Sequence, residues 1–552
     1  MLKTDNTFAI YCIPDKNNFD FADISHDHNL TFFKGSKIEH YLHLERITGK
    51  KFDNSLHRNL YFILKKLKLI DGDFDIIFVD NVIGRSCITE DGKVRLESIF
   101  SKKLHSDVEK AYAFWFEKAR AVYVLNHELA HIYANIPFFG SFRENSLLLH
   151  FDGGASKSNF SLWHYKNGHT YLVDYGWKWK YLSNLFNANA LNFFILNFNR
   201  PRHNSFPGSF MGYTAYGQAD RKILQWLKDN NFFSDIWHDK KRFFKAAKAT
   251  FGWDKSNFDP KDKFLQSIAA TMQSFFTEEI IIHLKKFQQQ TGAEYLYYSG
   301  GSALNISTNT AIVNSGIFSD IFIPPVPNDA GLSIGAGAYL QLKKGYTIEL
   351  HSPYLNNFGI ECEPLSDTHS ESLIKRISEL ILQRNVIGLV RDCAEAGPRA
   401  LGNRSIIALA DSRDMYKRVS GKIKKRQWYR PLAPVMLERN AKLFTGLKNI
   451  HHLSKYMLLA FKILPKYVNH IPAVVHIDGT ARIQTIFNRK QHPFLYDLLD
   501  YLDRKYNVKA LINTSFNGKG QPIVHTCDSA LKTAKNIGLD YLVCQNDIIE
   551  IK

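Results

Sequence analysis

The sequence of 552 residues contains few cysteines and no long apolar segment. Its six cysteines, at positions 12, 87, 362, 393, 527 and 544, are widely separated and form no C-x-x-C pair, so neither a disulfide scaffold nor a thiolate zinc site is suggested. No apolar run approaches the ~18 residues that span a bilayer, and the first residues lack the apolar core of a signal peptide. We therefore expect a soluble, cytoplasmic protein with no membrane partner.

Glycine and proline are also too rare for a collagen-like or linker-dominated chain, since they number 32 and 17. With 45% hydrophobic and 22% charged residues, the composition is that of a folded globular protein. At roughly 150 residues per domain, the length allows two to four domains. A loop-like stretch over residues 351–370 precedes a new helix and strand pattern, so we place a domain boundary near residue 360, dividing the chain into residues 1–360 and 361–552.

Acidic residues are outnumbered, with 53 Asp and Glu against 71 Lys and Arg, which gives a net charge of +18. This excess favours polyanionic ligands only where the basic residues gather in one place. Here they form short clusters scattered between segments of mixed sign, as a solvated surface does. The charge alone is weak evidence for nucleic acid, and we do not favour nucleic acid as a partner.

Alternating helical and strand-like segments predict an α/β fold with mainly parallel pairing in the central region. Residues 107–136 contain no Gly or Pro and repeat apolar residues at helical spacing, which predicts one long helix. Residues 146–151 are typical of a buried strand, ended by a polar glycine turn at residues 152–154. A second helix over 261–290 precedes a strand at 294–298 and another glycine turn. Residues 30–44 favour a hairpin nearer the N-terminus.

His127 and His131 belong to an H-E-x-x-H motif on a predicted helix, where the i, i+4 spacing places both imidazoles on one face. Two interpretations are open. In a zinc protease Glu128 would be the general base; otherwise only the histidine pair matters and oxygen ligands complete a metal site. Asp152 and Asp329, each beside glycines, would make with that pair a mixed nitrogen and oxygen site suited to iron, manganese or zinc.

Two glycine turns are candidates for contact with a nucleotide. Gly153 follows Asp152 at the end of a predicted strand, where a carboxylate can lie near a phosphate or its metal. Gly300 and Gly301 also follow a strand and lead to Asn305 at a predicted helix start, where backbone amides can approach a phosphate or nucleoside closely. A glycine pair is equally typical of a simple tight turn.

These motifs, taken in order, resemble the nodulation-type O-carbamoyltransferases. The resemblance runs from about residue 120 to 530 and includes the specific string GPRALGNRS at residues 397–405. The other matching stretches are residues 207–217, 300–305, 325–336, 426–434, 476–484 and 513–517.

The resemblance implies an ASKHA-class (actin-like ATPase) domain followed by a YrdC-like domain. The YrdC-like domain of the family converts carbamoyl phosphate and Mg-ATP to carbamoyl-adenylate, and the other domain moves the carbamoyl group to a hydroxyl, here of a small molecule or glycan. The family's metal ligands, two His and two Asp, map onto the four residues already collected: His127, His131, Asp152 and Asp329. Iron(II) is the expected ion, with manganese or zinc as alternatives.

The two anionic substrates repel each other, so the activating site requires fixed cations, with arginine preferred for bidentate contact with phosphate. The candidates are Arg399, Arg404, Lys424, Arg426, Arg430 and Arg482. Ser515 and Asn517 follow a predicted strand at 510–512, where a loop can hold the adenylate or the carbamoyl amide.

The sequence departs from the family near both ends. Residues 8–18 lack the family's glycine turn, and His28 stands where serine is usual, although His26 aligns and is a candidate base or acceptor-site residue. Gln521 replaces a common carboxylate. A tRNA-modifying or maturation factor that uses the same two folds is the alternative, and a metalloprotease the minor one. The acceptor and the oligomeric state, a homo-oligomer among the options, are left open.

Overall fold

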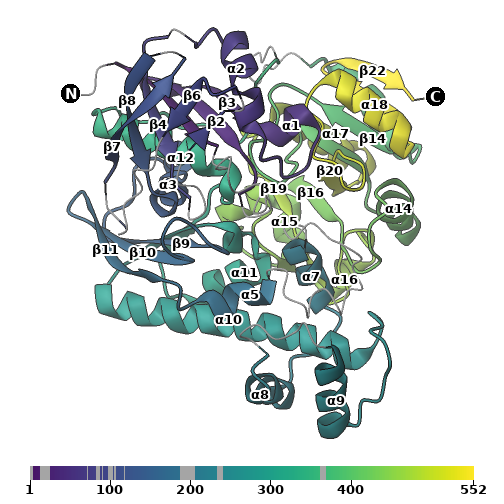
Figure 1. The fold of residues 1–552 in the computed structure, drawn as a ribbon. Helices are drawn as coiled ribbons and strands as arrows, with labels where there is room; N and C mark the ends of the chain where they lie inside the picture. The colour runs from purple at the N-terminus through teal and green to yellow at the C-terminus, as the bar shows by residue number, and fades with distance from the viewer. Residues whose placement is uncertain are drawn as a thin grey trace.

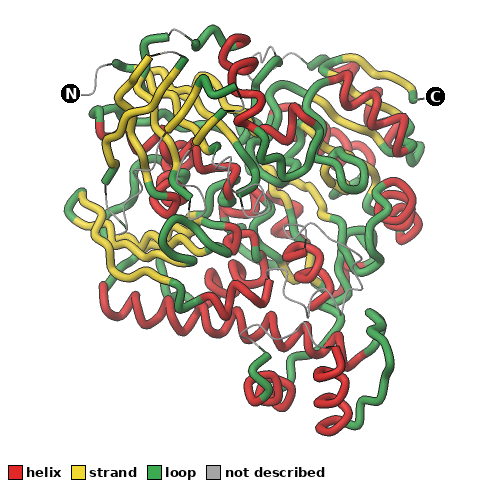
Figure 2. Tube along the Cα trace, viewed as in Figure 1, coloured by secondary structure: helices red, strands yellow, loops and turns green. Residues whose placement is uncertain are grey.

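The computed structural model describes residues 4–12, 25–70, 72–81, 87–89, 91–96, 104, 107–116, 118–186, 206–232, 240–360 and 369–551. Three large sheets organise them, with helices between and around the sheets (Figures 1 and 2). The predicted α/β class is confirmed. The predicted domain boundary at residue 360 adjoins residues 361–368, which lie outside the described part of the chain.

The first sheet has eight strands in the order β3-β2-β1-β4-β8-β7-β6-β5. Strands β1 (Asn6–Tyr11), β2 (Asn29–Lys34) and β3 (Lys37–His43) form an antiparallel meander, which confirms the predicted hairpin. Parallel pairing then joins β1 to β4 (Asp75–Val79) and β4 to β8 (Lys118–Leu125). The antiparallel strands β7 (Glu109–Trp115), β6 (Val94–Leu96) and β5 (Cys87–Ile88) extend the far edge.

The second sheet has five strands in the order β11-β10-β9-β12-β13. Again the first three form an antiparallel meander: β9 (Ser146–Phe151), β10 (Phe160–Lys166) and β11 (His169–Gly176). Strands β12 (Tyr295–Ser299) and β13 (Asp320–Phe322) then add in parallel. In both sheets the first four strands therefore follow one order, third-second-first-fourth, and a further parallel strand pairs with the fourth: β8 in the first sheet and β13 in the second. This repetition agrees with the ASKHA-class domain that the resemblance implies.

Residues 107–136 do not form the single helix that we predicted. They form β7, β8 and then α3 (His127–Tyr133), followed by α4 (Ile136–Phe139). Burial alternates along β7, where Ala111, Ala113 and Trp115 are buried while Tyr112 and Phe114 are exposed. That period of two is the strand pattern. Large apolar residues on the exposed face hid the alternation.

Helices α3 and α12 (Leu332–Lys343) lie between the first two sheets (Figure 1). Helix α12 packs on β1, β2 and β4, whereas α3 packs on β9 and β12. Gly335 lets the two helices approach closely, since a Cβ there would lie 1.7 Å from the Ala130 carbonyl oxygen. The backbone contact fixes the end of α3 against the start of α12.

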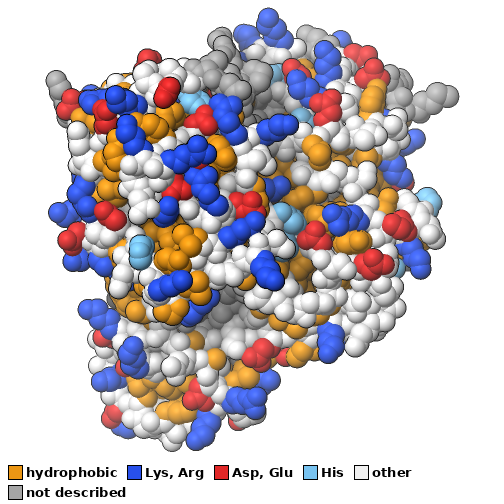
Figure 3. Space-filling model, turned by 180° about the vertical axis from the view of Figure 1, so that it is seen from behind, with side chains coloured by type: hydrophobic (Ala, Val, Ile, Leu, Met, Phe, Trp, Pro, Cys, Tyr) orange, Lys and Arg blue, Asp and Glu red, His pale blue; other side chains and the backbone are white. Residues whose placement is uncertain are grey.

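The other side of the second sheet is covered by α10 (Lys263–Thr291), α5 (Lys180–Phe186), α7 (Phe206–Thr214) and α11 (Ile306–Ser315). The predicted helix at 261–290 is thus confirmed. From one end of α10, α8 (Arg221–Asp229) and α9 (Lys240–Phe251) project away from the body (Figure 1). Among the described residues, no helix is both long and apolar enough to cross a bilayer. Figure 3 shows Lys and Arg side chains dispersed over one face, as the sequence indicated.

The C-terminal part is built on a seven-stranded sheet in the order β19-β16-β20-β15-β14-β21-β22. Its strands are β14 (Ile387–Val390), β15 (Arg404–Leu409), β16 (Ala433–Leu437), β19 (Gln484–Ile486), β20 (Leu511–Ser515), β21 (Tyr541–Cys544) and β22 (Asp547–Glu550). Helices α13 (Glu371–Leu382) and α17 (Pro493–Tyr506) pack on one face, and α18 (Cys527–Ile537) packs against β14 and β21. The YrdC-like assignment of this part stays a prediction.

Short elements complete the described chain. Near the N-terminus these are α1 (Leu44–Thr48) and α2 (Leu56–Lys66). In the C-terminal part they are α14 (Arg413–Tyr416), α15 (Glu438–Thr445), α16 (Pro465–Val468), β17 (Phe461–Lys462) and β18 (Thr480–Ala481).

A disulfide that the sequence did not indicate joins Cys527 to Cys544, with their Cα atoms 5.9 Å apart. It links the start of α18 to the end of β21. The two residues lie 17 positions apart with no C-x-x-C pattern, so only the folded arrangement reveals the pair. The expectation of a chain without disulfides is corrected at this position.

Candidate functional site

The four predicted metal ligands meet in one cluster. The Nε2 atoms of His127 and His131 lie 3.0 Å apart, and they lie 3.6 and 3.4 Å from Asp329 Oδ1. Asp152 Oδ2 lies 3.6 Å from His131 Nε2. Both histidines and Asp329 are buried, while Asp152 is half-buried. Residues up to 202 positions apart in sequence therefore form two overlapping groups of donor atoms that share His131, one with His127 and Asp329 and the other with Asp152 and His150.

Local structure explains how each ligand reaches the cluster. Asn126 caps α3 by accepting a hydrogen bond from the Leu129 backbone N–H, so the helix begins at His127 and both imidazoles lie on one face. Asp152 follows the last residue of β9, and Asp329 begins the short turn before α12. The close contact of α3 with α12 then brings the histidine pair to Asp329.

The donor set fits a divalent ion. Bonds of about 2.1 Å to one ion separate two donor atoms by about 3.0 Å at a right angle and about 3.4 Å at a tetrahedral angle. The observed separations of 3.0 to 3.6 Å match those values. Burial would raise the pKa of Asp329, but His26 and His127 hold it well below its usual range, so the carboxylate is charged.

Glu128 does not face the cluster. Its Oε1 accepts hydrogen bonds from the Lys157 backbone N–H at 2.8 Å and from the Ser158 hydroxyl at 2.9 Å. The carboxylate therefore anchors the loop after β9 to α3. This placement favours the interpretation in which the histidine pair matters and Glu128 is not a general base.

Three polar residues that the sequence analysis did not identify hold Asp329 in place. The Tyr11 hydroxyl donates to Asp329 Oδ2 at 3.2 Å, and Asn81 Nδ2 lies 3.1 Å from the Tyr11 oxygen as its donor. Asn29 Nδ2 donates to the Asp329 backbone carbonyl at 2.8 Å. All three are buried and belong to or follow strands of the first sheet. Nothing local in the sequence indicates contacts between such distant residues.

His26 lies at the edge of the cluster, as expected for an acceptor-site residue. Its Nε2 is 4.0 Å from Asp329 Oδ2, and its Nδ1 is 3.1 Å from Asp27 Oδ2. Burial would lower the pKa of His26, but Asp329 and Asp27 raise it to about 10. His28, the departure from the family pattern, is instead buried among structural contacts, and burial lowers its pKa to about 3. It is a neutral core histidine.

The glycine turns hold Asp152. The Gly301 and Gly153 backbone N–H groups donate to the two Asp152 oxygens, each at 2.6 Å. Gly300 has φ = 99°, and a Cβ there would lie 2.2 Å from the Phe151 carbonyl oxygen, so only glycine fits. Asn305 caps α11 by accepting from the Thr308 N–H at 3.1 Å. In this structure the Gly153 and Gly301 backbone N–H groups orient the Asp152 carboxylate, and Asn305 caps a helix; contact with a phosphate stays a prediction.

A second cluster contains only cations. Arg399, Arg426, Arg430 and Arg482 are half-buried, and none forms an ion pair with a carboxylate of the described residues. Burial lowers the pKa of Arg426 to about 9, with Arg430 and Arg399 adding repulsion. Burial and the same neighbours also lower the pKa of Arg482. Four adjacent cations without counter-charges are an anion-binding arrangement.

The remaining two predicted cations have structural partners. Lys424 donates to the backbone carbonyls of Ser515 and Asn517, each at 2.6 Å, and so fixes the loop after β20. Gln521 closes that loop, since its Oε1 accepts from the Gly518 N–H at 3.2 Å. The Arg404 guanidinium is fully buried, and it donates to the carbonyls of His525, Arg391, Asn403 and Asp392. These contacts position the loops around the arginine cluster.

Glu395 organises the loop that carries GPRALGNRS. Its Oε1 accepts hydrogen bonds from three backbone N–H groups, those of Leu401, Asn403 and Arg404, at 2.7 to 3.1 Å. The side chain is fully buried. The sequence analysis missed Glu395, although a lone acidic residue two positions before the string was the available signal.

The two clusters lie on adjoining loops. A Cβ on Gly397 would lie 2.1 Å from the Pro325 carbonyl oxygen, so the GPRALGNRS loop rests directly on the segment leading to Asp329. The Tyr41 hydroxyl donates to the Ala330 carbonyl at 2.7 Å and approaches the Ala396 carbonyl at 3.4 Å. These contacts join the loop that carries Arg399 to the segment that carries Asp329.

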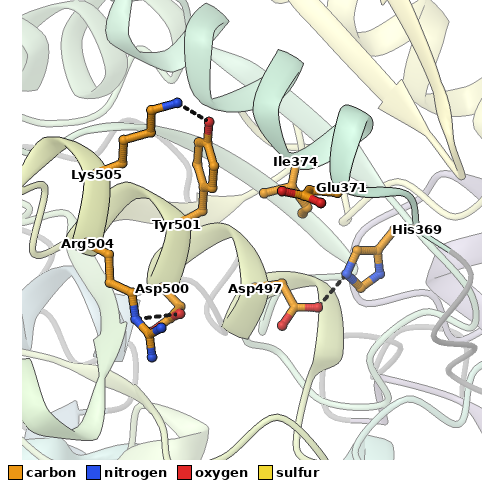
Figure 4. Close-up of a pocket in the computed structure, with 8 residues that line it drawn as sticks. All are labelled: His369, Glu371, Ile374, Asp497, Asp500, Tyr501, Arg504 and Lys505. Atoms are coloured by element: carbon orange, nitrogen blue, oxygen red, sulfur yellow. Dashed lines mark hydrogen bonds and ion pairs between the residues drawn. The ribbon is translucent and has the colours of Figure 1, made fainter.

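A separate pocket of about 440 Å³ lies between α13 and α17 (Figure 4). His369 Nε2 lies 2.7 Å from Asp497 Oδ2 at its edge, and Arg504 pairs with Asp500. None of the predicted site residues lines it. It is not part of the two clusters.

Comparison with known families decides the identity of the chain. Residues 22–338 match the family model for the carbamoyltransferase N-terminus, and residues 378–550 match that for the carbamoyltransferase C-terminus. The chain belongs to the carbamoyltransferase family. This confirms the resemblance seen in the sequence.

This carbamoyltransferase is similar to nodulation protein NolO of Bradyrhizobium diazoefficiens. The two sequences are 32% identical over 50% of this chain and 53% of the relative's length. Nodulation protein U of Azorhizobium caulinodans is 32% identical over 46% of this chain and 45% of its own length. The chain thus spans about half the length of these curated relatives. An uncharacterized protein of Methanocaldococcus jannaschii is 26% identical over 83% of this chain and 78% of its own.

Solved structures offer more distant likenesses. The activator of 2-hydroxyisocaproyl-CoA dehydratase from Clostridium difficile, with bound ADPNP, is 12% identical over 62% of this chain and 96% of its own, with a TM-score of 0.31. Full-length HypF in its phosphate- and nucleotide-bound form is 13% identical over 62% of this chain and 56% of its own, with a TM-score of 0.31. At these TM-scores the likenesses carry no functional argument.

Proposed function

We propose that this protein is an ATP-dependent O-carbamoyltransferase. In the part of the chain after residue 360, water would release inorganic phosphate from carbamoyl phosphate, and the resulting carbamate would attack the α-phosphate of ATP to form carbamoyl-adenylate and pyrophosphate. The part before residue 360 would transfer the carbamoyl group to a hydroxyl of a small molecule or glycan. The observation that carries the proposal is the arginine cluster, four cations for which the described residues offer no carboxylate partner; one of them, Arg399, lies on the loop that contacts the segment leading to Asp329.

The first half-reaction would take place at Arg399, Arg426, Arg430 and Arg482. ATP and carbamoyl phosphate carry several negative charges that repel each other, and four guanidinium groups offset that repulsion and orient the phosphates. Burial and neighbouring arginines lower the pKa of Arg399, Arg426 and Arg482, so a bound anion would relieve a repulsion already present in the protein. Lys424, Arg404, Ser515 and Asn517 would act by shaping the surrounding loops.

The second half-reaction would take place at the other cluster, where His127, His131, Asp152 and Asp329 would hold a divalent ion. When bound, such an ion neutralises charge on the phosphate of the leaving adenylate. The acceptor oxygen attacks the carbamoyl carbon, and AMP leaves with the bond electrons. His26 would take the hydroxyl proton. Asp329 and Asp27 raise its pKa to about 10, so it would act as a base only when a cation on Asp329 offsets part of that rise.

Pyrophosphate release tests the proposal. Purified protein is incubated with Mg-ATP and radiolabelled carbamoyl phosphate, with iron(II), manganese or zinc supplied in separate reactions. We expect pyrophosphate to appear only when both substrates are present, and label then to pass to a member of a panel of hydroxylated metabolites and glycans. Absence of substrate-dependent pyrophosphate with every ion would overturn the proposal.

A further inference from the structure

We propose that His150 supplies a third imidazole to the ion that His127, His131, Asp152 and Asp329 would hold. The inference rests on the metal centre of the proposed function, but it concerns a residue that neither the sequence motif nor the four-ligand set includes. It would make the centre one of three histidines and two carboxylates.

The position of His150 on β9 directs it to the cluster. It lies two residues before Asp152, and side chains at i and i+2 of a strand project from the same face. A ring nitrogen of His150, a ring nitrogen of His131 and a carboxylate oxygen of Asp152 all lie within 4.8 Å of one another. Strand β9 therefore presents two donor groups in succession toward α3.

The environment of His150 gives its ring no other partner. The residue is fully buried, and within the described residues neither Nδ1 nor Nε2 has a hydrogen-bond partner. More than about 90% of buried polar groups in proteins are hydrogen-bonded, and each one left unpaired costs about 1–3 kcal/mol. Leu148, two residues earlier on the same face of the strand, is also fully buried, so an apolar side chain is accommodated on this face. A metal ion bound by His150 would give one of these two nitrogens a partner and so explain a buried imidazole at this position.

The three rings have the separations that imidazoles on one ion require. Ring centres are 4.8 Å apart for His127 and His131, 5.0 Å for His131 and His150, and 6.3 Å for His127 and His150. With a nitrogen–metal bond of about 2.1 Å, a ring centre lies about 3.2 Å from the ion, so two rings are about 4.5 Å apart at a right angle and about 6.4 Å apart when opposed. The observed set corresponds to His131 beside both others, with His127 and His150 nearly opposed.

Metal affinity of the His150→Val variant tests the assignment. Valine suits a buried strand position and removes both unpaired nitrogens, so the metal-free variant is expected to unfold at the parent's temperature or higher. The affinity for manganese, cobalt and zinc, measured by competition with a chelator, is expected to fall by about 10- to 100-fold. Leu148→Val, on the same face of the same strand, is the matched control and is expected to stay within about 3-fold.

Copper(II) bound to the unmodified protein provides a second measurement that needs no variant. Its electron paramagnetic resonance spectrum is expected to show coupling to three nitrogens, and to two in His150→Val. Two nitrogens in the parent, or unchanged affinity in a folded His150→Val, would overturn the inference and leave His150 a core residue. Pyrophosphate release is measured separately: its absence together with a three-nitrogen centre would overturn the proposed function alone.

Discussion

The two clusters differ in how their charges are balanced. In the histidine and aspartate cluster, carboxylates face imidazoles at 3.4 to 3.6 Å, and Tyr11 and Gly301 donate further hydrogen bonds. In the arginine cluster every side chain carries the same sign, and no carboxylate of the described residues offsets it. The first is held together by interactions among its own groups, whereas the described residues offer the second no opposite charge. We therefore expect substitutions in the arginine cluster to reduce carbamoyl-adenylate formation, and substitutions in the histidine and aspartate cluster to reduce carbamoyl transfer.

The largest expected effect is that of Arg430→Ala. Removing one of the cations that bind the phosphates should lower pyrophosphate release by about 100-fold or more, because such contacts act where charge develops. Rates with saturating Mg-ATP and carbamoyl phosphate measure it. Arg384→Ala, an exposed arginine paired with Asp411 in the same part of the chain, serves as control and should retain the parent rate. Equal losses in both variants would mean that the effect of Arg430→Ala is not specific to the arginine cluster.

His127→Ala should separate the two half-reactions. Pyrophosphate release should stay within about 3-fold of the parent, while metal affinity falls by about 10- to 100-fold and delivery to an acceptor is blocked. Label transfer and pyrophosphate are followed in the same reaction. If delivery is unaffected, the metal assignment is wrong.

Arg482→Met should show the repulsion within the arginine cluster as a gain in stability. Replacing a buried cation beside Arg399, Arg426 and Arg430 with an apolar side chain should raise the free energy of unfolding by about 1 kcal/mol, while activation is lost. Denaturant unfolding without ligands measures the gain. A loss of stability would mean that the cluster is not under charge repulsion.

Glu128→Gln should have the smallest effect. The amide oxygen can still accept from the Lys157 N–H and the Ser158 hydroxyl, so carbamoylation should stay within about 3-fold of the parent. The assay is label transfer at saturating substrate. A drop of 100-fold with normal metal content would instead make Glu128 a catalytic base.

Local patterns were sufficient for several elements of the site. The strand at residues 146–151, the glycine turn after 299, the helix at 261–290 and the single-faced pair His127 and His131 all follow from short-range periodicity and turn chemistry. The four predicted metal ligands could be collected because each lies in a recognisable motif. The fold brings them close together, with His131 shared between a group with His127 and Asp329 and a group with Asp152.

Contacts between residues far apart in the chain could not be predicted from the sequence. Tyr11 and Asp329 are separated by 318 positions, and Asn29 and Asp329 by 300, so no local signal connects them. Residues 109–125 were predicted as helix because apolar residues on both faces of the strands obscure the period of two. Glu395 and His150 were missed because a lone buried polar residue has no motif; only its surroundings reveal a role.

The absence of a side chain at Gly335 sets how closely α12 approaches the helix that carries His127 and His131. The two helix backbones are in contact there, since a Cβ on Gly335 would lie 1.7 Å from the Ala130 carbonyl oxygen. This backbone contact therefore fixes the distance between the histidine pair and Asp329. The histidine and aspartate side chains should therefore keep their separations without an ion, and the protein should bind one without refolding. An alanine at this position would push the two helices apart and change the distances between the predicted metal ligands, although none of the ligands is replaced.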